Sequence, residues 1–154
     1  MNAEDLIAQV TEARTEKTTL CWQVASAMNP QLAAAALAGA EVRALLNEVQ
    51  ASQQVPALLA LSVIARTPNL VHNPGIPLGR ALGSIYGDNH LEAMAASVTL
   101  AAPQAATLIG GAVARAARHG SMNLVEFVTL IAAWDTLTAR ERSAFLIELH
   151  RSRA

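Results

Sequence analysis

The chain has 154 residues, a length that suits one domain with a single well-formed core. Its net charge of −1 argues against a nucleic-acid partner, whose phosphates require a clustered basic surface. Apolar residues make up 53% of the chain, whereas charged residues make up 15% and aromatic residues 3%. Alanine and leucine therefore supply most of the apolar content, and both residues favour helices.

Capping residues mark several helix starts. Asn2 precedes two acidic residues, and Asn29 precedes Pro30, whose missing N–H costs nothing at the first helical position. Three further capping residues stand three positions before a glutamate, a spacing that lets each side chain bind the other's free backbone N–H. These pairs are Asn89 with Glu92, Asn123 with Glu126, and Thr138 with Glu141.

Prolines and glycines add further boundaries. Pro56, Pro77 and Pro103 are expected to begin helices, because proline fits the first turn. Gly87 and Gly120 are expected to end them, since glycine adopts the backbone conformation that commonly terminates a helix.

These signals predict an all-α fold, a compact multi-helix bundle of about eight to ten short helices. We place the helices near 3–14, 16–28, 30–38, 40–51, 55–66, 77–86, 90–101, 103–118, 123–134 and 138–151. The first two, and the two that meet at Gly39, are alternatively single longer helices. A short α-solenoid is the alternative architecture, although no fixed period with signature residues supports it. Strands are not expected, because no window shows strict alternation with β-branched residues.

One long loop, residues 67–76, divides the chain into two parts. It is either a crossover within one helical domain spanning 1–154 or a subdivision of that domain. After it comes the longest uncharged run, Ala93 to Ala114, which is long enough to span a bilayer. Pro103 and Gln104 lie at its centre, and small residues dominate it. Two buried helices that meet at Pro103 explain this run better than a membrane span.

Glycines recur at every fourth position between the loop and the next helices, at Gly75, Gly79, Gly83 and Gly87. In a helix, Gly79 and Gly83 lie on one face, because residues four apart are neighbours. Glycine in a helix is less favourable than alanine by about 1 kcal/mol, so another backbone is expected to pack closely on this face. A phosphate-binding loop is disfavoured, because the run lacks the Lys-Ser/Thr pair and the G-x-G-x-x-G pattern.

Polar residues near this run are the candidate ligand contacts: His72, Arg80, Tyr86, Asp88 and His90. Histidine and aspartate can bind a metal or act as a base and its orienting partner. Their spacing matches no standard ligand pattern, so we expect no metal site, no cofactor and no catalytic group. The five residues stay candidates only for binding a small molecule.

Other basic residues are interpreted as structural. Arg142 and His150 stand farther apart than the Arg-to-His pair of HEPN-type ribonucleases. Arg115 and Arg118 could hold an anion, but they fall in the last turn of a helix, where cations are favoured in any case. His119 is interpreted as a helix-end residue by the same logic.

The first functional hypothesis is a non-enzymatic, cytoplasmic, bacterial-type helical protein that binds other proteins. A lone cysteine, Cys21, and an acidic amino-terminal stretch favour the reducing cytosol. Thin polar cover over 55–65, 93–114 and 124–134 predicts an exposed apolar surface and a homodimer with carboxy-terminal helices at its interface. No nucleic-acid or membrane partner is expected. The alternative is a small-molecule sensor or enzyme with an apolar pocket near residues 72–90.

Overall fold

The computed structural model describes residues 1–83 and 96–151, with side chains described as far as residue 145. The described residues form helices and no strand, which confirms the all-α prediction. The helices are α1 (Ala3–Glu16), α2 (Thr19–Ala25), α3 (Pro30–Ala36), α4 (Ala40–Leu45), α5 (Ala51–Arg66), α6 (Leu78–Gly83), α8 (Ala102–Ala116), α9 (Leu124–Ala133) and α10 (Ala139–Arg151). Two short 3₁₀ turns, η1 (Ser97–Thr99) and η2 (Trp134–Thr136), flank α8 and α9.

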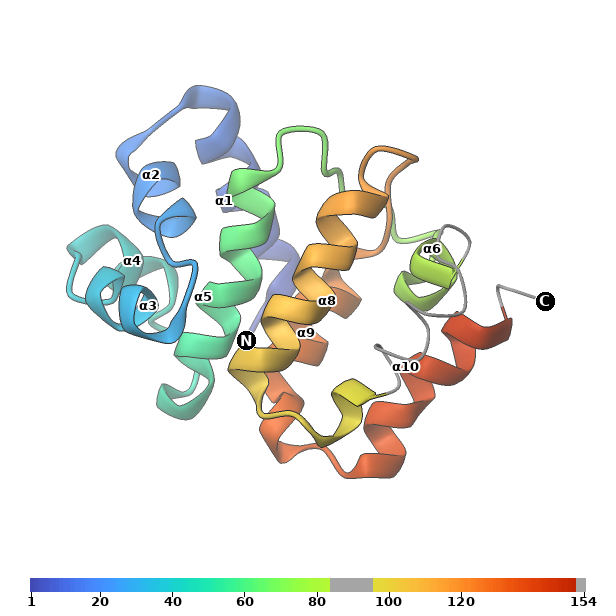
Figure 1. The fold of residues 1–154 in the computed structure, drawn as a ribbon. Coiled ribbons are helices and arrows are strands. Elements are labelled where there is room, and N and C mark those ends of the chain that lie inside the picture. The colour runs from blue at the N-terminus through green and yellow to red at the C-terminus, as the bar shows by residue number, and fades with distance from the viewer. Residues whose placement is uncertain (84–95, 152–154) are drawn as a thin grey trace.

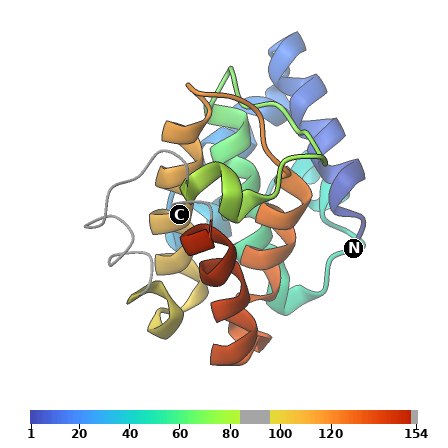
Figure 2. The ribbon, with the colours of Figure 1, turned by 90° about the vertical axis from the view of Figure 1, so that its right-hand side faces the viewer.

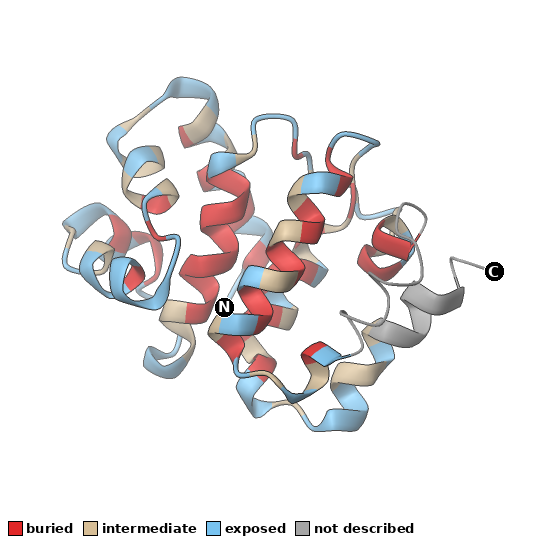
Figure 3. Cartoon of the chain, in the orientation of Figure 1, coloured by how far each residue is buried: buried red, intermediate tan, exposed pale blue. Residues whose placement is uncertain are grey.

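Helix α5 forms the centre of the molecule (Figure 1). Every residue from Pro56 to Ala65 is buried, and α1, α2, α3, α8 and α9 pack against it. The burial map shows this helix as a nearly continuous buried rod (Figure 3). The sequence explains the position, because a helix that is apolar all round has to be covered on all sides. The exposed apolar surface expected over 55–65 is therefore wrong, since the chain's own helices cover it.

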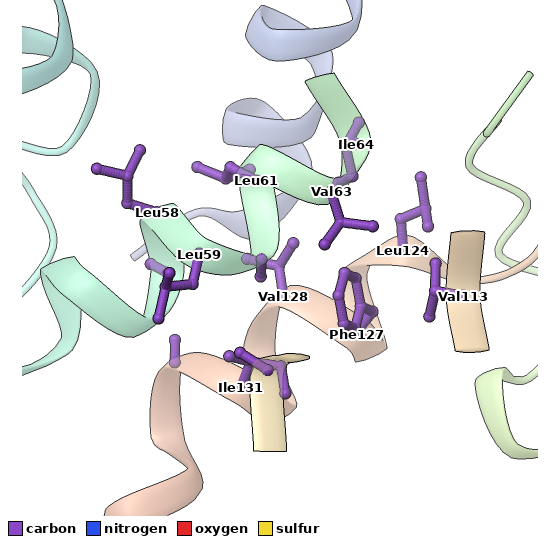
Figure 4. Packing of buried hydrophobic residues seen from close by; sticks show 14 of the residues in the cluster. Leu58, Leu59, Leu61, Val63, Ile64, Val113, Leu124, Phe127, Val128 and Ile131 are labelled. Carbon is purple, nitrogen blue, oxygen red and sulfur yellow. The ribbon is translucent and has the colours of Figure 1, made fainter. Parts of the chain in front are cut away.

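Helices on both sides of the long loop share one core. Figure 4 shows side chains of α5 and α9 meeting around Phe127 and Val128, with Val113 of α8 beside them. Phe127, Val128 and Trp134 have no exposed surface. The loop between α5 and α6 lies against the turn before α9, where His72 and Met122 form an isolated parallel bridge. The backbone N–H of Asn73 donates to the carbonyl oxygen of Met122 over 2.8 Å.

The predicted caps at Asn2 and Asn29 are confirmed. Asn2 Oδ1 accepts from the Asp5 N–H over 3.0 Å, and Asn29 Oδ1 accepts from the Leu32 N–H over 2.9 Å. The predicted Asn89–Glu92 cap and the stop at Gly87 lie outside the described residues. Gly120 does end the turn after α8, with a φ of +153°.

The two glutamate-containing caps close differently. Thr138 and Glu141 exchange hydrogen bonds of 3.0 and 3.2 Å, as predicted. The bond from the Thr138 backbone N–H to the Glu141 carboxylate lowers the pKa of Glu141. Asn123 Oδ1 accepts from the Glu126 N–H over 3.1 Å, but the return bond is missing. The backbone N–H of Asn123 donates instead to the carbonyl oxygen of Ile76 over 2.8 Å.

Proline positions match two of the three predictions. Pro103 lies in the first turn of α8, and Pro77 directly precedes α6. Pro56 does not begin a helix, because α5 already begins at Ala51. The proline removes one backbone bond, but the side chain of Gln54 holds this end of the helix by donating to the carbonyl oxygens of Leu46 and Val49.

The helices suggested as merged pairs are separate. Lys17 adopts a left-handed conformation with a φ of 55° and ends α1. Gly39 is extended and precedes α4. Among the described residues, no helix is long and apolar enough to cross a bilayer, and the uncharged run is broken between η1 and α8.

Candidate functional site

Helix α6 lies between α8, α9 and α10 on the face shown in Figure 2. It packs mainly against α10, and its residues Leu78, Gly79, Leu82 and Gly83 are buried. Both glycines are buried, and Gly79 also lines a groove, so the close approach of another backbone to this face stays a prediction. The helix separates two hollows of different character.

The larger hollow is a groove of about 430 Å³ between α6, α9 and α10. Its apolar lining consists of Leu78, Leu130, Ala133, Leu137, Ala144 and Phe145, together with Gly79. Its charged lining residues are both acidic, Glu126 and Glu141. The groove is thus an apolar trough with a negative rim.

Both glutamates are held by backbone donors. Glu126 Oε2 accepts from the Leu78 N–H over 3.4 Å, and its Oε1 accepts from Asn123 Nδ2 over 3.1 Å. Glu126 therefore ties the start of α9 to the start of α6, where a carboxylate is favoured by the helix dipole. The cap fixes Glu141 in the same way at the start of α10. Neither carboxylate forms an ion pair with a described residue, so both negative charges remain at the rim.

The second hollow is a pocket of about 300 Å³ on the other side of α6. Its lining residues are Ile76, Arg80, Ala81, Ala116, His119, Gly120 and Ser121. Arg80 and His119 are exposed, and no described residue binds either side chain. This pocket is therefore basic, whereas the groove is acidic.

The sequence candidates fall in different places. Arg80 lines the basic pocket, but His72 is absent from its lining. His72 Nδ1 instead accepts from the Leu124 N–H over 3.0 Å, so this side chain caps α9. Tyr86, Asp88 and His90 lie outside the described residues. Among the residues that the structure does describe, no three metal-ligating side chains come together.

Sequence reasoning missed His119 and the groove. His119 was interpreted only as a helix-end residue, which its exposed position beside Gly120 also supports. The sequence of α9 could have indicated the groove, because Leu130 and Ala133 continue the apolar pattern of this helix beyond the face that α5 covers. Its other walls come from α6 and α10, and no local pattern brings those helices together.

Comparison with known proteins adds no relative: no family model, no curated protein and no solved structure matches the chain.

Proposed function

We propose that the chain is a non-enzymatic protein that acts by binding a polypeptide in the α6–α9–α10 groove. The groove supports this proposal because a contiguous apolar hollow with a polar rim is typical of a protein-binding surface. Its volume of about 430 Å³ accommodates several apolar side chains of one helix. Apolar grooves commonly bind the apolar face of an amphipathic helix.

A second copy of the chain is the occupant that we propose. The acidic groove, with Glu126 and Glu141, lies beside the basic pocket, with Arg80 and His119. Helix α6 contributes to both hollows. A two-fold axis passing near α6 would place the groove of one copy against the basic rim of the other, and the reverse contact would follow by symmetry. Opposite charges on the two surfaces favour this pairing over a random encounter.

The proposed setting is the cytoplasm. Cys21 is the chain's one cysteine, and it is half-buried with its Sγ 4.0 Å from the carbonyl oxygen of Ala65. A thiol placed in this way is a packing residue, which suits a reducing compartment.

Light scattering during size exclusion tests the proposal. We expect a dimer at micromolar concentration that dissociates over a dilution series. Ala144→Glu adds a third acid to the groove at an exposed position, so it should shift the mass toward the monomer. Ala8→Glu is the matched control, since Ala8 is also exposed and lies on α1, outside the groove lining.

Two results would contradict the proposal. One is an Ala144→Glu variant whose dimer is as stable as the wild-type dimer. The other is a monomeric mass at every concentration, which would favour a second candidate function. In that function the basic pocket binds a small anionic molecule. The observation in its favour is that Arg80 and His119 both line the pocket and that no described residue binds either side chain.

A further inference from the structure

A third hollow lies between the central helix α5 and helix α8, and it shares no lining residue with the groove or the basic pocket. Its volume is about 170 Å³. Leu59 and Val63 of α5, Gly110 and Gly111 of α8, and Met28 provide an apolar surface, and Arg66 is its only charged lining residue among those described.

Arg66 is anchored along one edge only. Its Nε donates to the carbonyl oxygen of Ser62 over 3.2 Å and to Ser62 Oγ over 3.1 Å. The Ser62 hydroxyl in turn donates to the carbonyl oxygen of Ala25 over 3.1 Å. These bonds orient the guanidinium group, while no described residue binds its Nη1 or Nη2.

The other arginines with bound guanidinium groups use these nitrogens within the fold. Arg14 Nη1 donates to the carbonyl oxygens of Ile64 and Thr67, and Arg142 uses Nε, Nη1 and Nη2. Although the Arg66 side chain reaches the surface, partial burial of its guanidinium group lowers its pKa. A partly desolvated cation that forms no ion pair with a described residue favours an anionic ligand.

Gly111 supplies an independent observation. A Cβ atom at Gly110 would lie 2.8 Å from Val63 Cγ2, so close packing of α5 on α8 explains that glycine. A Cβ atom at Gly111 would meet nothing within 4 Å. Glycine within a helix is less favourable than alanine, and the packing of the described residues gives no reason for it here. The open backbone at Gly111 widens the pocket beside Arg66.

We propose that this pocket binds a small aliphatic monocarboxylate. The carboxylate would accept two hydrogen bonds from the Nη1 and Nη2 edge of Arg66, a geometry that arginine provides and lysine does not. The alkyl part would lie over Gly110 and Gly111, between the side chains of Leu59, Val63 and Met28.

The neighbouring hydroxyl groups favour a monocarboxylate over phosphate. The hydroxyl of Thr67 donates to the carbonyl oxygen of Val63 over 2.6 Å, and that of Thr107 donates to the carbonyl oxygen of Pro103 over 3.2 Å. Neither hydroxyl is free to donate to a ligand, so Arg66 is the one strong donor group among the described residues that line the pocket. Arg66 can bind both oxygens of a carboxylate, whereas a phosphate dianion would keep further oxygens without a donor from the described lining residues.

Titration of the full chain with sodium butyrate, followed by amide chemical shifts, tests the proposal. We expect saturable shifts at Gly110 and Gly111, and no comparable shifts with butylamine or sodium chloride. Arg66→Gln removes the guanidinium fork and should weaken butyrate binding by at least about tenfold. Arg118→Gln is the control, because Arg118 is an exposed arginine outside the pocket.

Gly111→Ala keeps the test informative if Arg66→Gln fails to fold. The added methyl group has space and favours the helix, so the variant should fold well yet bind butyrate more weakly. Three results would overturn the proposal: no saturable shift with butyrate, equal binding by wild type and Arg66→Gln, or tighter binding of inorganic phosphate than of butyrate.

Discussion

Arg142 joins three segments at one end of the bundle. Its Nη1 donates to the carbonyl oxygen of Val98 over 2.7 Å, and its Nε and Nη2 donate to that of Trp134 over 3.0 and 2.7 Å. The guanidinium group also lies 4.9 Å from the centre of the Trp134 ring, and the indole N–H donates to the carbonyl oxygen of Leu100 over 2.8 Å. Arg142 therefore ties η1, η2 and α10 together.

Arg142→Lys should lower the free energy of unfolding by about 1–3 kcal/mol, since hydrogen bonds to charged groups contribute about that much. Lysine keeps the charge but cannot reach two carbonyl groups in the planar geometry of arginine. Urea unfolding measures the effect. Arg140→Lys is the control, because Arg140 is exposed two residues away and should change stability by less than about 0.5 kcal/mol. Equal stability of the two variants would contradict this role.

The helix caps could be predicted from the sequence, but the long-range hydrogen bonds of Arg142 and His72 could not. Asn2, Asn29 and Thr138 bind groups three positions away, so the sequence alone contains both partners. Arg142 binds Val98, 44 positions away, and His72 binds the N–H of Leu124, 52 positions away. Such contacts depend on how the helices pack.

The crossing of α5 and α8 depends on one of two adjacent glycines. Gly110→Ala would bring a methyl group within 2.8 Å of Val63 Cγ2, so we expect it to destabilise the fold by about 1–3 kcal/mol. Gly111→Ala meets nothing within 4 Å and should stabilise the fold by up to about 1 kcal/mol. Thermal unfolding of the two variants compares them directly. A Gly110→Ala variant as stable as the wild type, or more stable, would show that the crossing is looser than described.

Close packing around α6 gives a second prediction for an element. Gly83 is buried on a helix that packs against α8, α9 and α10. Gly83→Leu should cost several kcal/mol, since overpacking a close contact typically costs about 1–3 kcal/mol and sometimes more. Chemical unfolding measures this cost. A neutral result would mean that this face is open, and would favour a ligand-binding role for the glycine run.

Element types were predictable, whereas several boundaries were not. Periodic apolar residues and caps located α1, α3, α8, α9 and α10 to within a few residues. The prediction that α5 begins near Pro56 is wrong, because the helix begins at Ala51. The Gln54 side chain stabilises this first turn by donating to the carbonyl oxygens of Leu46 and Val49. Lys17 separates α1 from α2 in a left-handed conformation that its residue type does not indicate.

Across the described residues, the apolar side chains divide between the core and the surface. Some of them are inside, because α5 is buried along ten consecutive residues from Pro56 to Ala65. Others line the groove, where Leu130 and Phe145 are only half-buried. Composition indicated an apolar excess but could not divide it between core and surface, since the division depends on where α6 and α10 pack.

The central claim is that a second copy of the chain occupies the α6–α9–α10 groove. Hydrogen–deuterium exchange tests it most directly when measured at a concentration at which the protein is dimeric and again after dilution by about tenfold. If a second copy occupies the groove, amides of α6, α9 and α10 should be more protected at the higher concentration, while those of α1 to α4 stay unchanged. Protection that increases in α1 to α4 instead, or a dimer that protects no amide of α6, α9 or α10, would contradict the account.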